Sequence, residues 1–354
     1  MFFNILIILF CLIALMALHE LGHFLMAKKF GVDVEEFGIG YPPRIFGKKF
    51  KGTLYSLNLL PFGAFVKIKG EEGEENIENS KSFSQKPIWQ RSLIIFGGVG
   101  FFWIIAIVIL TSVMFFWGVP TSVPDDWEGA YKAEVMVTQT FDDFPAALAG
   151  IEMGDKIVNF NRMNEFQEFI KENKEKEITL NIKRGEEIFD INLTPVISDF
   201  NENEGAIGVA LARVINIKYP WYSAPIQGVF ITAKQTIAIP VMLGTLFKNA
   251  IQGKETQGAK FVGPIGIGKI MTDALDHGIV NFLMFLSMIS IWLAVFNILP
   301  IPALDGGKLL FLAIEKIRGK AVNPKTEQKI TLVFFSLLIG LMLFVTIKDI
   351  IGLF

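Results

Sequence analysis

The sequence predicts a polytopic α-helical membrane protein with four transmembrane helices, a β-hairpin after the first helix and one inserted α/β domain. Hydrophobic residues make up 52% of the 354 residues, and several segments are long and apolar enough to span a bilayer. The chain is too apolar for a soluble domain and, at 19% charged residues, too charged for a simple helical bundle. Its formal net charge of −2 gives no indication of nucleic-acid binding.

The four predicted spans are apolar stretches of about 20 residues or more. They cover residues 2–27, 92–119, 279–299 and 330–354. Lysine and arginine are concentrated in the loops after the first and third spans, so the positive-inside rule places both loops in the cytoplasm. The region between the second and third spans is then expected on the outer side of the membrane.

The first span contains the motif His19-Glu20-Leu21-Gly22-His23. An ionisable residue inside a span indicates a functional site. The two histidines lie one turn apart on the same face of a helix. In this arrangement two histidines bind Zn²⁺ and the glutamate acts as general base on a metal-bound water. A pair of hydrogen-bonded structural histidines is the alternative. We predict a zinc site with Glu20 as the base, near the cytoplasmic end of the span.

A catalytic zinc ion usually has three protein ligands, and Asp305 is the expected third. It follows a helix end that two prolines interrupt, on the same side of the membrane as His19 and His23. Non-helical backbone at membrane depth is tolerated where protein buries it or it lines a cavity. A helix cap or turn residue is the alternative for Asp305. Asn297, two turns earlier, is placed to hydrogen-bond a substrate backbone, and His277 is expected to be an outer loop residue.

A fifth apolar segment, residues 224–247, contains Lys234 and Pro240. If it crossed the membrane, the third span would reverse its direction and Asp305 would lie on the side opposite the two histidines. We therefore expect a helix that lies along the outer interface or dips into it.

Two further segments have the alternating pattern of strands. Residues 32–69 are predicted to form a β-hairpin. Residues 125–197 are predicted to form one α/β domain, with a strand at 133–138, a helix at 164–173 and a hairpin that turns at Arg184-Gly185. This domain resembles a PDZ domain, which adds a peptide strand to a sheet edge or captures a carboxylate. A size-excluding domain without a ligand is the alternative.

Together these features resemble the site-2 protease family of intramembrane zinc metalloproteases, in particular the bacterial proteases that regulate sigma-factor signalling. The resemblance covers nearly the whole chain and rests on residues 19–23, 61–67, 263–267 and 297–307. It implies the following roles: Zn²⁺ binding by His19, His23 and Asp305, activation of water by Glu20, and substrate binding by Asn297, Gly63 and Phe65.

The resemblance also implies that the hairpin is a re-entrant sheet beside the active site. The chain departs from the family pattern at two places. The segment from Gly97 to Phe102, early in the second span, lacks the usual Asn, and Ala64 replaces a usual Gly. The first departure puts any contact from that Asn in doubt.

The expected domains are an N-terminal membrane half (1–120), a PDZ-like domain (121–200), a linker with the interfacial helix (201–278) and a C-terminal membrane half (279–354). The expected activity is cleavage of transmembrane segments of single-pass membrane proteins, such as anti-sigma factors or signal-peptide remnants. Cleavage would follow removal of the extracytoplasmic part and occur near the cytoplasmic leaflet of the bacterial cytoplasmic membrane. The expected partners are these substrates and the lipid bilayer, and the sequence does not determine the oligomeric state. A non-catalytic membrane scaffold that binds processed proteins through the PDZ-like domain is the alternative.

Overall fold

The computed structural model describes most of the chain, which divides into two compact units. The described residues are 2–71, 81–127, 133–141, 143–185, 187–198, 201–253 and 262–351. Each unit is described by itself below.

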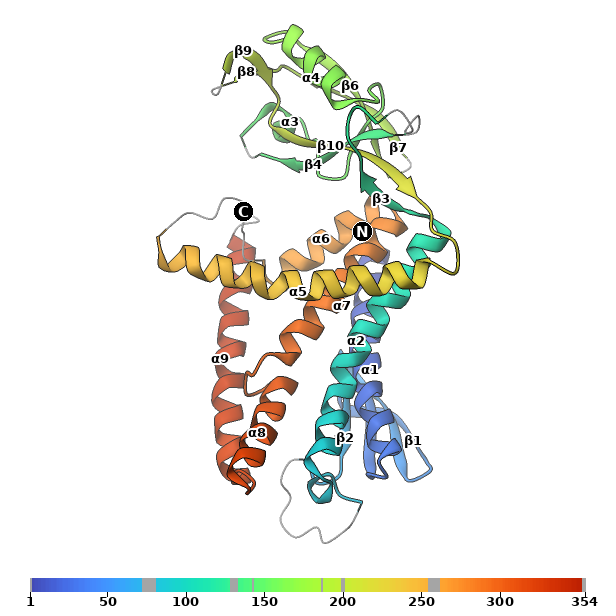
Figure 1. Ribbon diagram of the computed structural model, residues 1–354, viewed down its shortest axis with the longest axis vertical. Coiled ribbons are helices and arrows are strands. Elements are labelled where there is room, and N and C mark those ends of the chain that lie inside the picture. The colour runs from blue at the N-terminus through green and yellow to red at the C-terminus, as the bar shows by residue number, and fades with distance from the viewer. Residues whose placement is uncertain are drawn as a thin grey trace. The chain divides into compact units, whose positions relative to one another are not determined.

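The first unit comprises residues 1–109, 227–272 and 285–354. It is built mainly from long helices (Figure 1). Its elements, some of which continue into the second unit, are α1 (Phe2–Lys29), β1 (Val34–Phe50), β2 (Thr53–Ile68), the short 3₁₀ helix η1 (Phe83–Gln85), α2 (Ile88–Phe116), α5 (Ala224–Ile251), α6 (Pro264–Asp276), α7 (Ile279–Ile298), α8 (Asp305–Arg318) and α9 (Pro324–Ile351).

Five helices in the described part of the chain are long and apolar enough to cross a membrane, namely α1, α2, α5, α7 and α9. Four of them coincide with the predicted spans. The fifth, α5, continues unbroken through Pro240 and runs across α2 and α7 rather than alongside them (Figure 1). Its Ile239 packs into one cluster with Ala106 of α2 and with Ile291 and Val295 of α7. The architecture is therefore that of a multi-pass helical membrane protein, as the sequence predicts.

Helices α1 and α2 approach each other closely at a pair of glycines. A Cβ atom on Gly22 would lie 2.2 Å from the carbonyl oxygen of Gly97, and one on Gly97 would lie 2.7 Å from the carbonyl oxygen of Gly22. Small residues at helix interfaces allow this backbone contact in membranes. The contact brings α2 against the turn of α1 that carries the histidine motif.

The predicted β-hairpin is formed by β1 and β2, which pair antiparallel and turn at Lys51 and Gly52. The first half of β1 pairs with both halves of β2, so that Gly38 is opposite Ser56 on one side and Phe65 on the other. The hairpin thus forms a small folded sheet, with exposed apolar side chains on the strand that follows Tyr41.

The helical structure is interrupted between α7 and α8, at the predicted proline-containing segment. Gly306 and Gly307 at the start of α8 allow this segment to fold back onto the helix. Cβ atoms on them would lie 2.0 Å from the Leu299 carbonyl oxygen and 2.4 Å from the Ile301 carbonyl oxygen. The two glycines after Asp305 are therefore required by close backbone contact.

A carboxylate from α9 caps the N-terminus of α6. Asp349 accepts hydrogen bonds from the backbone N–H of Gly263, at 3.1 Å, and of Gly266, at 2.9 Å. The first N–H groups of a helix have no partner within the helix, and the helix dipole favours a negative charge at this end. This contact accounts for the glycine-containing segment that precedes the third predicted span.

The second unit comprises residues 110–226 and 273–284. It contains a six-stranded sheet of order β3-β10-β4-β5-β6-β7, in which neighbouring strands are antiparallel. Its elements are β3 (Val119–Ser122), β4 (Glu134–Thr140), α3 (Pro145–Leu148), β5 (Lys156–Ile157), α4 (Met163–Glu172), β6 (Ile178–Arg184), β7 (Glu187–Leu193), β8 (Val196–Ser198), β9 (Asn201–Ala206) and β10 (Val209–Ile217).

The core of this unit lies between the sheet and α4. Phe166 and Ile170 of α4 are buried against sheet residues that include Val137, Leu180 and Ile182. The predicted strand, helix and hairpin are all present. The sheet also includes β10, which lies beyond the expected domain end at residue 200.

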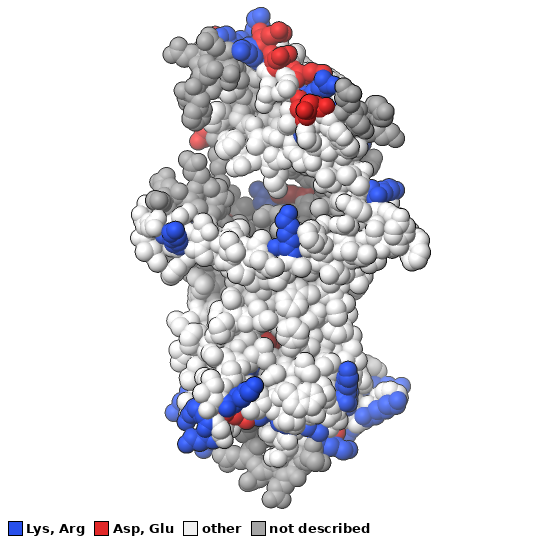
Figure 2. All heavy atoms as spheres, viewed as in Figure 1, with Lys and Arg blue, Asp and Glu red and all other residues white. Residues whose placement is uncertain are grey.

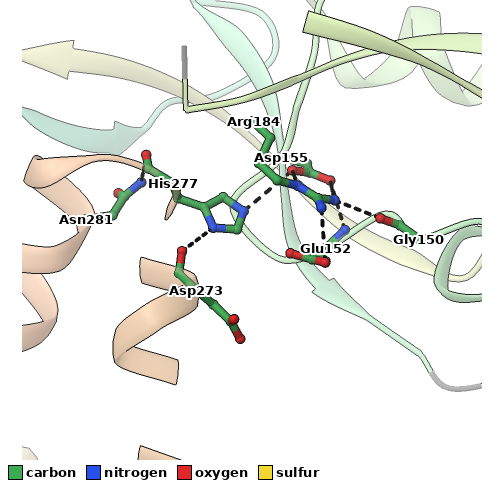
Figure 3. A network of polar contacts seen from close by, with 7 residues as sticks. All are labelled: Gly150, Glu152, Asp155, Arg184, Asp273, His277 and Asn281. Atoms are coloured by element: carbon green, nitrogen blue, oxygen red, sulfur yellow. Dashed lines mark hydrogen bonds and ion pairs between the residues drawn. The ribbon is translucent and has the colours of Figure 1, made fainter. Parts of the chain in front are cut away.

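A network of polar contacts centres on Asp155, whose side chain is completely buried in the second unit (Figure 3). Arg184 donates from Nε to Asp155 Oδ1 and from Nη2 to Asp155 Oδ2, both at 2.7 Å. His277, just before α7, lies on the other side of the carboxylate, with Nε2 3.6 Å from Oδ1. The third histidine of the chain thus contacts this carboxylate.

Candidate metal centre

Three side chains from two distant parts of the chain converge in the first unit. His19 Nε2 lies 3.3 Å from His23 Nε2, and Asp305 Oδ2 lies 3.4 Å from the first nitrogen and 3.2 Å from the second. All three residues are at least nine-tenths buried. The two histidines are one turn apart on α1, and Asp305 begins α8 directly after the proline-containing break.

This triangle has the dimensions of a zinc site. Zinc binds histidine nitrogen and carboxylate oxygen at about 2.0–2.2 Å, so the ligand atoms of a tetrahedral site are about 3.3 Å apart. Asp305 Oδ2 is buried and has no hydrogen-bond partner among the described residues. Two imidazole nitrogens and one carboxylate oxygen leave one tetrahedral position for water or substrate, as in catalytic zinc sites. The residues therefore fit Zn²⁺.

Helix α2 orients one of the two imidazoles. His23 Nδ1 lies 3.0 Å from the carbonyl oxygen of Ile94, which fixes Nδ1 as the protonated nitrogen and leaves Nε2 as an acceptor. Gly98 provides the space for this ring, because a Cβ atom there would lie 2.1 Å from His23 Nε2. The glycine-rich segment of α2 therefore serves the metal centre through its small size.

Glu20 is partly buried on α1 and interacts electrostatically with His23 and Asp305. Glu20 directly follows His19 in the chain, and a carboxylate is one of the side chains that can serve as a general base. Lys308 of α8, three residues after Asp305, forms an ion pair with Glu71 and donates to its Oε1 at 2.6 Å.

The residues expected to bind substrate lie outside this triangle. Asn297 donates from Nδ2 to the carbonyl oxygen of Leu293 on its own helix, at 2.9 Å. Phe65 of β2 stacks on Tyr41 of β1 with ring centroids 6.0 Å apart. Gly63 has a φ of 104°, and a Cβ atom added there would meet the ring of Tyr41 at 3.8 Å. The structure thus places Gly63 and Phe65 around one aromatic side chain.

Sequence reasoning missed Gly98, Tyr41 and the Lys308–Glu71 pair. Glu71 begins a run of acidic residues, and its side chain is largely buried against Lys308. The rest of that run lies outside the described residues. Among these missed residues, only Lys308 has a sequence signal that could have identified it, namely its position one turn after Asp305 on α8.

Comparison with known proteins agrees with this geometry. The model of peptidase family M50 matches residues 7–341. The zinc metalloprotease CPE1693 of Clostridium perfringens is 33% identical over 97% of this chain and 98% of its own length. The protein named regulator of sigma-W protease RasP, from Bacillus subtilis, is 29% identical over 95% of each chain. A zinc metalloprotease of Clostridium acetobutylicum, CA_C1796, is 32% identical over 99% of this chain and 98% of its own length.

The matches extend over nearly the whole chain. The relatives are named zinc metalloproteases, and the ligand geometry described above fits zinc. The chain belongs to peptidase family M50, the site-2 protease family, and is a membrane-embedded, zinc-dependent metalloendopeptidase.

Proposed function

We propose that this protein cleaves transmembrane segments of single-pass membrane proteins, within the bilayer and near its cytoplasmic face. The observation that carries the proposal is the His19–His23–Asp305 triangle inside a set of apolar helices. A hydrolytic centre in that position meets peptide bonds of membrane segments rather than those of soluble proteins.

The proposal assigns a role to each of the expected site residues. His19, His23 and Asp305 would hold zinc, which when bound would supply Lewis-acid activation of water and of the scissile carbonyl. Glu20 takes a proton from the attacking water and delivers it to the leaving amine. Asn297, Gly63 and Phe65 hold the substrate, which must be locally unwound because a helix sequesters its own amides.

The distribution of charge supports the proposed orientation. Figure 2 shows basic side chains gathered at the end of the first unit that carries the β1–β2 turn and the end of α8, below a band where few charged side chains reach the surface. An excess of Lys and Arg is typical of cytoplasmic loops. We place this end in the cytoplasm and the histidine motif near the cytoplasmic leaflet, with α5 at the outer interface.

The second unit is proposed to be an extracytoplasmic PDZ-like domain that screens substrates by size. Proteins whose bulky outer part has been removed would pass, and intact ones would be excluded. The Bacillus subtilis relative is named a regulator of sigma-W protease. By analogy, anti-sigma factors are proposed as substrates of this chain, together with signal-peptide remnants.

The test uses the full-length protein in detergent with a single-pass model substrate. Wild type and Glu20→Gln are incubated with and without a zinc chelator, and mass spectrometry locates any cut. We expect a cut within the hydrophobic segment that both the substitution and the chelator abolish, while Glu20→Gln retains zinc. Full activity of Glu20→Gln would exclude the proposed base.

A second substrate with a large folded outer domain tests the size filter and should be cleaved more slowly. If zinc is bound but no condition yields a cut in either substrate, the result favours the non-catalytic scaffold, in which the PDZ-like domain binds processed proteins.

A further inference from the structure

The two imidazoles of the metal centre are supported unequally. His23 has a backbone acceptor for its second ring nitrogen, the Ile94 carbonyl oxygen at 3.0 Å. His19 Nδ1 is buried and forms no hydrogen bond of normal length with the described residues, although the backbone of Gly98 lies near enough to act on it. Metal-binding histidines almost always donate this second N–H to a fixed partner, which sets the ring orientation. The Gly98 backbone thus supports His19 less well than the Ile94 carbonyl supports His23, and a further contact is needed to orient the His19 ring.

The contact that takes this place is an aromatic one. The ring of Phe102 on α2 stacks on the His19 ring with centroids 4.5 Å apart and planes inclined by 17°. His19 also meets His23 edge-on, with centroids 4.7 Å apart and planes inclined by 86°. Phe102 is completely buried, and interiors of this kind are close-packed. The imidazole of His19 thus contacts two rings, with its Nε2 3.4 Å from Asp305 Oδ2.

The segment of α2 that carries Phe102 is joined to α7 by a buried hydrogen bond. Ser290 Oγ, completely buried, donates to the carbonyl oxygen of Phe102 at 2.7 Å. Helix α7 leads through the proline-containing break to Asp305. The segment of α2 that carries Phe102 is therefore linked through Ser290 to the segment that carries Asp305.

We propose that Phe102 is a positioning residue for the zinc centre, which orients His19 by stacking while Ser290 keeps Phe102 in register with the segment that carries Asp305. The inference rests on the zinc site proposed above. Loss of the ring frees rotation of His19 about its side-chain bonds, and the zinc affinity falls by the roughly 10–100-fold typical of partners that orient metal ligands.

The test compares zinc affinity in the purified full-length protein. Phe102→Leu removes the ring, and Phe102→Met, whose flexible side chain fills more of the space, serves if the first variant does not fold. Phe96→Leu is the matched control, because Phe96 lies on the same helix, is exposed and contacts Trp103 instead of a histidine. Zinc affinity is measured by chelator competition, and the site geometry by the visible absorption spectrum of the Co²⁺-substituted protein.

We expect the Phe102 variants to lose zinc affinity by 10-fold or more and to change the Co²⁺ spectrum, while Phe96→Leu does neither. Ser290→Ala should show a smaller loss in the same direction, because it removes the hydrogen bond to the Phe102 carbonyl. If a folded Phe102 variant binds zinc as wild type does and keeps the Co²⁺ spectrum, the ring is only core packing and the inference is wrong. If wild type itself binds no zinc, the proposed site fails instead.

Discussion

His277 Nε2 lies 3.6 Å from Oδ1 of Asp155, a contact within the second unit between the residue that precedes α7 and a buried carboxylate of the sheet domain (Figure 3). The interaction with Asp155 raises the pKa of His277, against the opposing effect of burial. Burial alone would raise the pKa of Asp155, but the hydrogen bonds from Arg184 and the Glu152 N–H, together with the contact with His277, outweigh it and lower the pKa. The folded state therefore favours the charged form of both groups.

The first prediction concerns the pH dependence of stability. A histidine with a raised pKa in the folded state contributes stability that is fully present below its unfolded pKa, near 6.5, and is lost as the pH rises through the folded value. Asp155 contributes in the opposite sense, with stability that is lost as the pH falls through its lowered pKa. Wild type should therefore lose more thermal stability between pH 6 and pH 9 than His277→Asn.

The measurement is the unfolding temperature of the full-length protein in detergent at the two pH values. Groups elsewhere in the chain titrate in both proteins and cancel in the comparison. Equal losses in wild type and His277→Asn would show that the Asp155–His277 contact carries no pH-dependent stability.

The second prediction concerns the third ligand. Asp305→Ala removes the only carboxylate oxygen of the triangle and leaves two imidazoles, so the zinc content and cleavage should fall together, by more than the roughly 10–100-fold that an orienting partner costs. Metal analysis and the cleavage assay give the two values. Normal zinc content in this variant would remove Asp305 from the ligand set.

The third prediction concerns the space that Gly98 leaves for His23. A Cβ atom at Gly98 would lie 2.1 Å from His23 Nε2, so Gly98→Ala should displace the ring and lower zinc affinity. Gly100→Ala is the matched control, because its nearest neighbour outside its own helix backbone is a side-chain atom of Phe96 at 3.9 Å. This control should bind zinc normally and gain up to about 1 kcal/mol from helix propensity. Equal zinc affinity in the two variants would contradict the steric argument.

The fourth prediction concerns the cap of α6. Asp349→Ala leaves the N–H groups of Gly263 and Gly266 without their acceptor, and should cost about 1 kcal/mol of stability. Hydrogen exchange of residues 263–268 should accelerate in this variant. Lys348→Ala, at the exposed neighbouring position, is the control and should leave both quantities unchanged. Exchange in Asp349→Ala at the wild-type rate would show that the cap adds nothing.

Part of the candidate site was accessible from the sequence because it depends on local geometry. Two histidines four residues apart share a helix face wherever the helix lies, and their Nε2 atoms are 3.3 Å apart in the structure. The apolar spans, the proline break before Asp305 and the alternation of the two hairpins are likewise properties of single segments. The expectation for α5 needed an argument about the whole topology, and its position at the membrane interface remains a proposal.

The supporting contacts were not accessible in this way. Gly98, Phe102 and the Ile94 carbonyl contact the two histidines only because α2 packs on α1 at Gly22 and Gly97. The Lys308–Glu71 pair joins segments far apart in the chain. The place of β10 inside the sheet depends in the same way on pairing between distant strands.

The sequence by itself therefore determined the membrane architecture, the hairpins and the residue types of a zinc hydrolase, because periodicity and short spacing specify helices, strands and ligand faces. Only the tertiary structure decided how the two imidazoles are oriented, what Glu71 contacts and that His277 contacts Asp155. Each of these depends on the distance and angle between packed elements, which side-chain volume at many positions sets jointly.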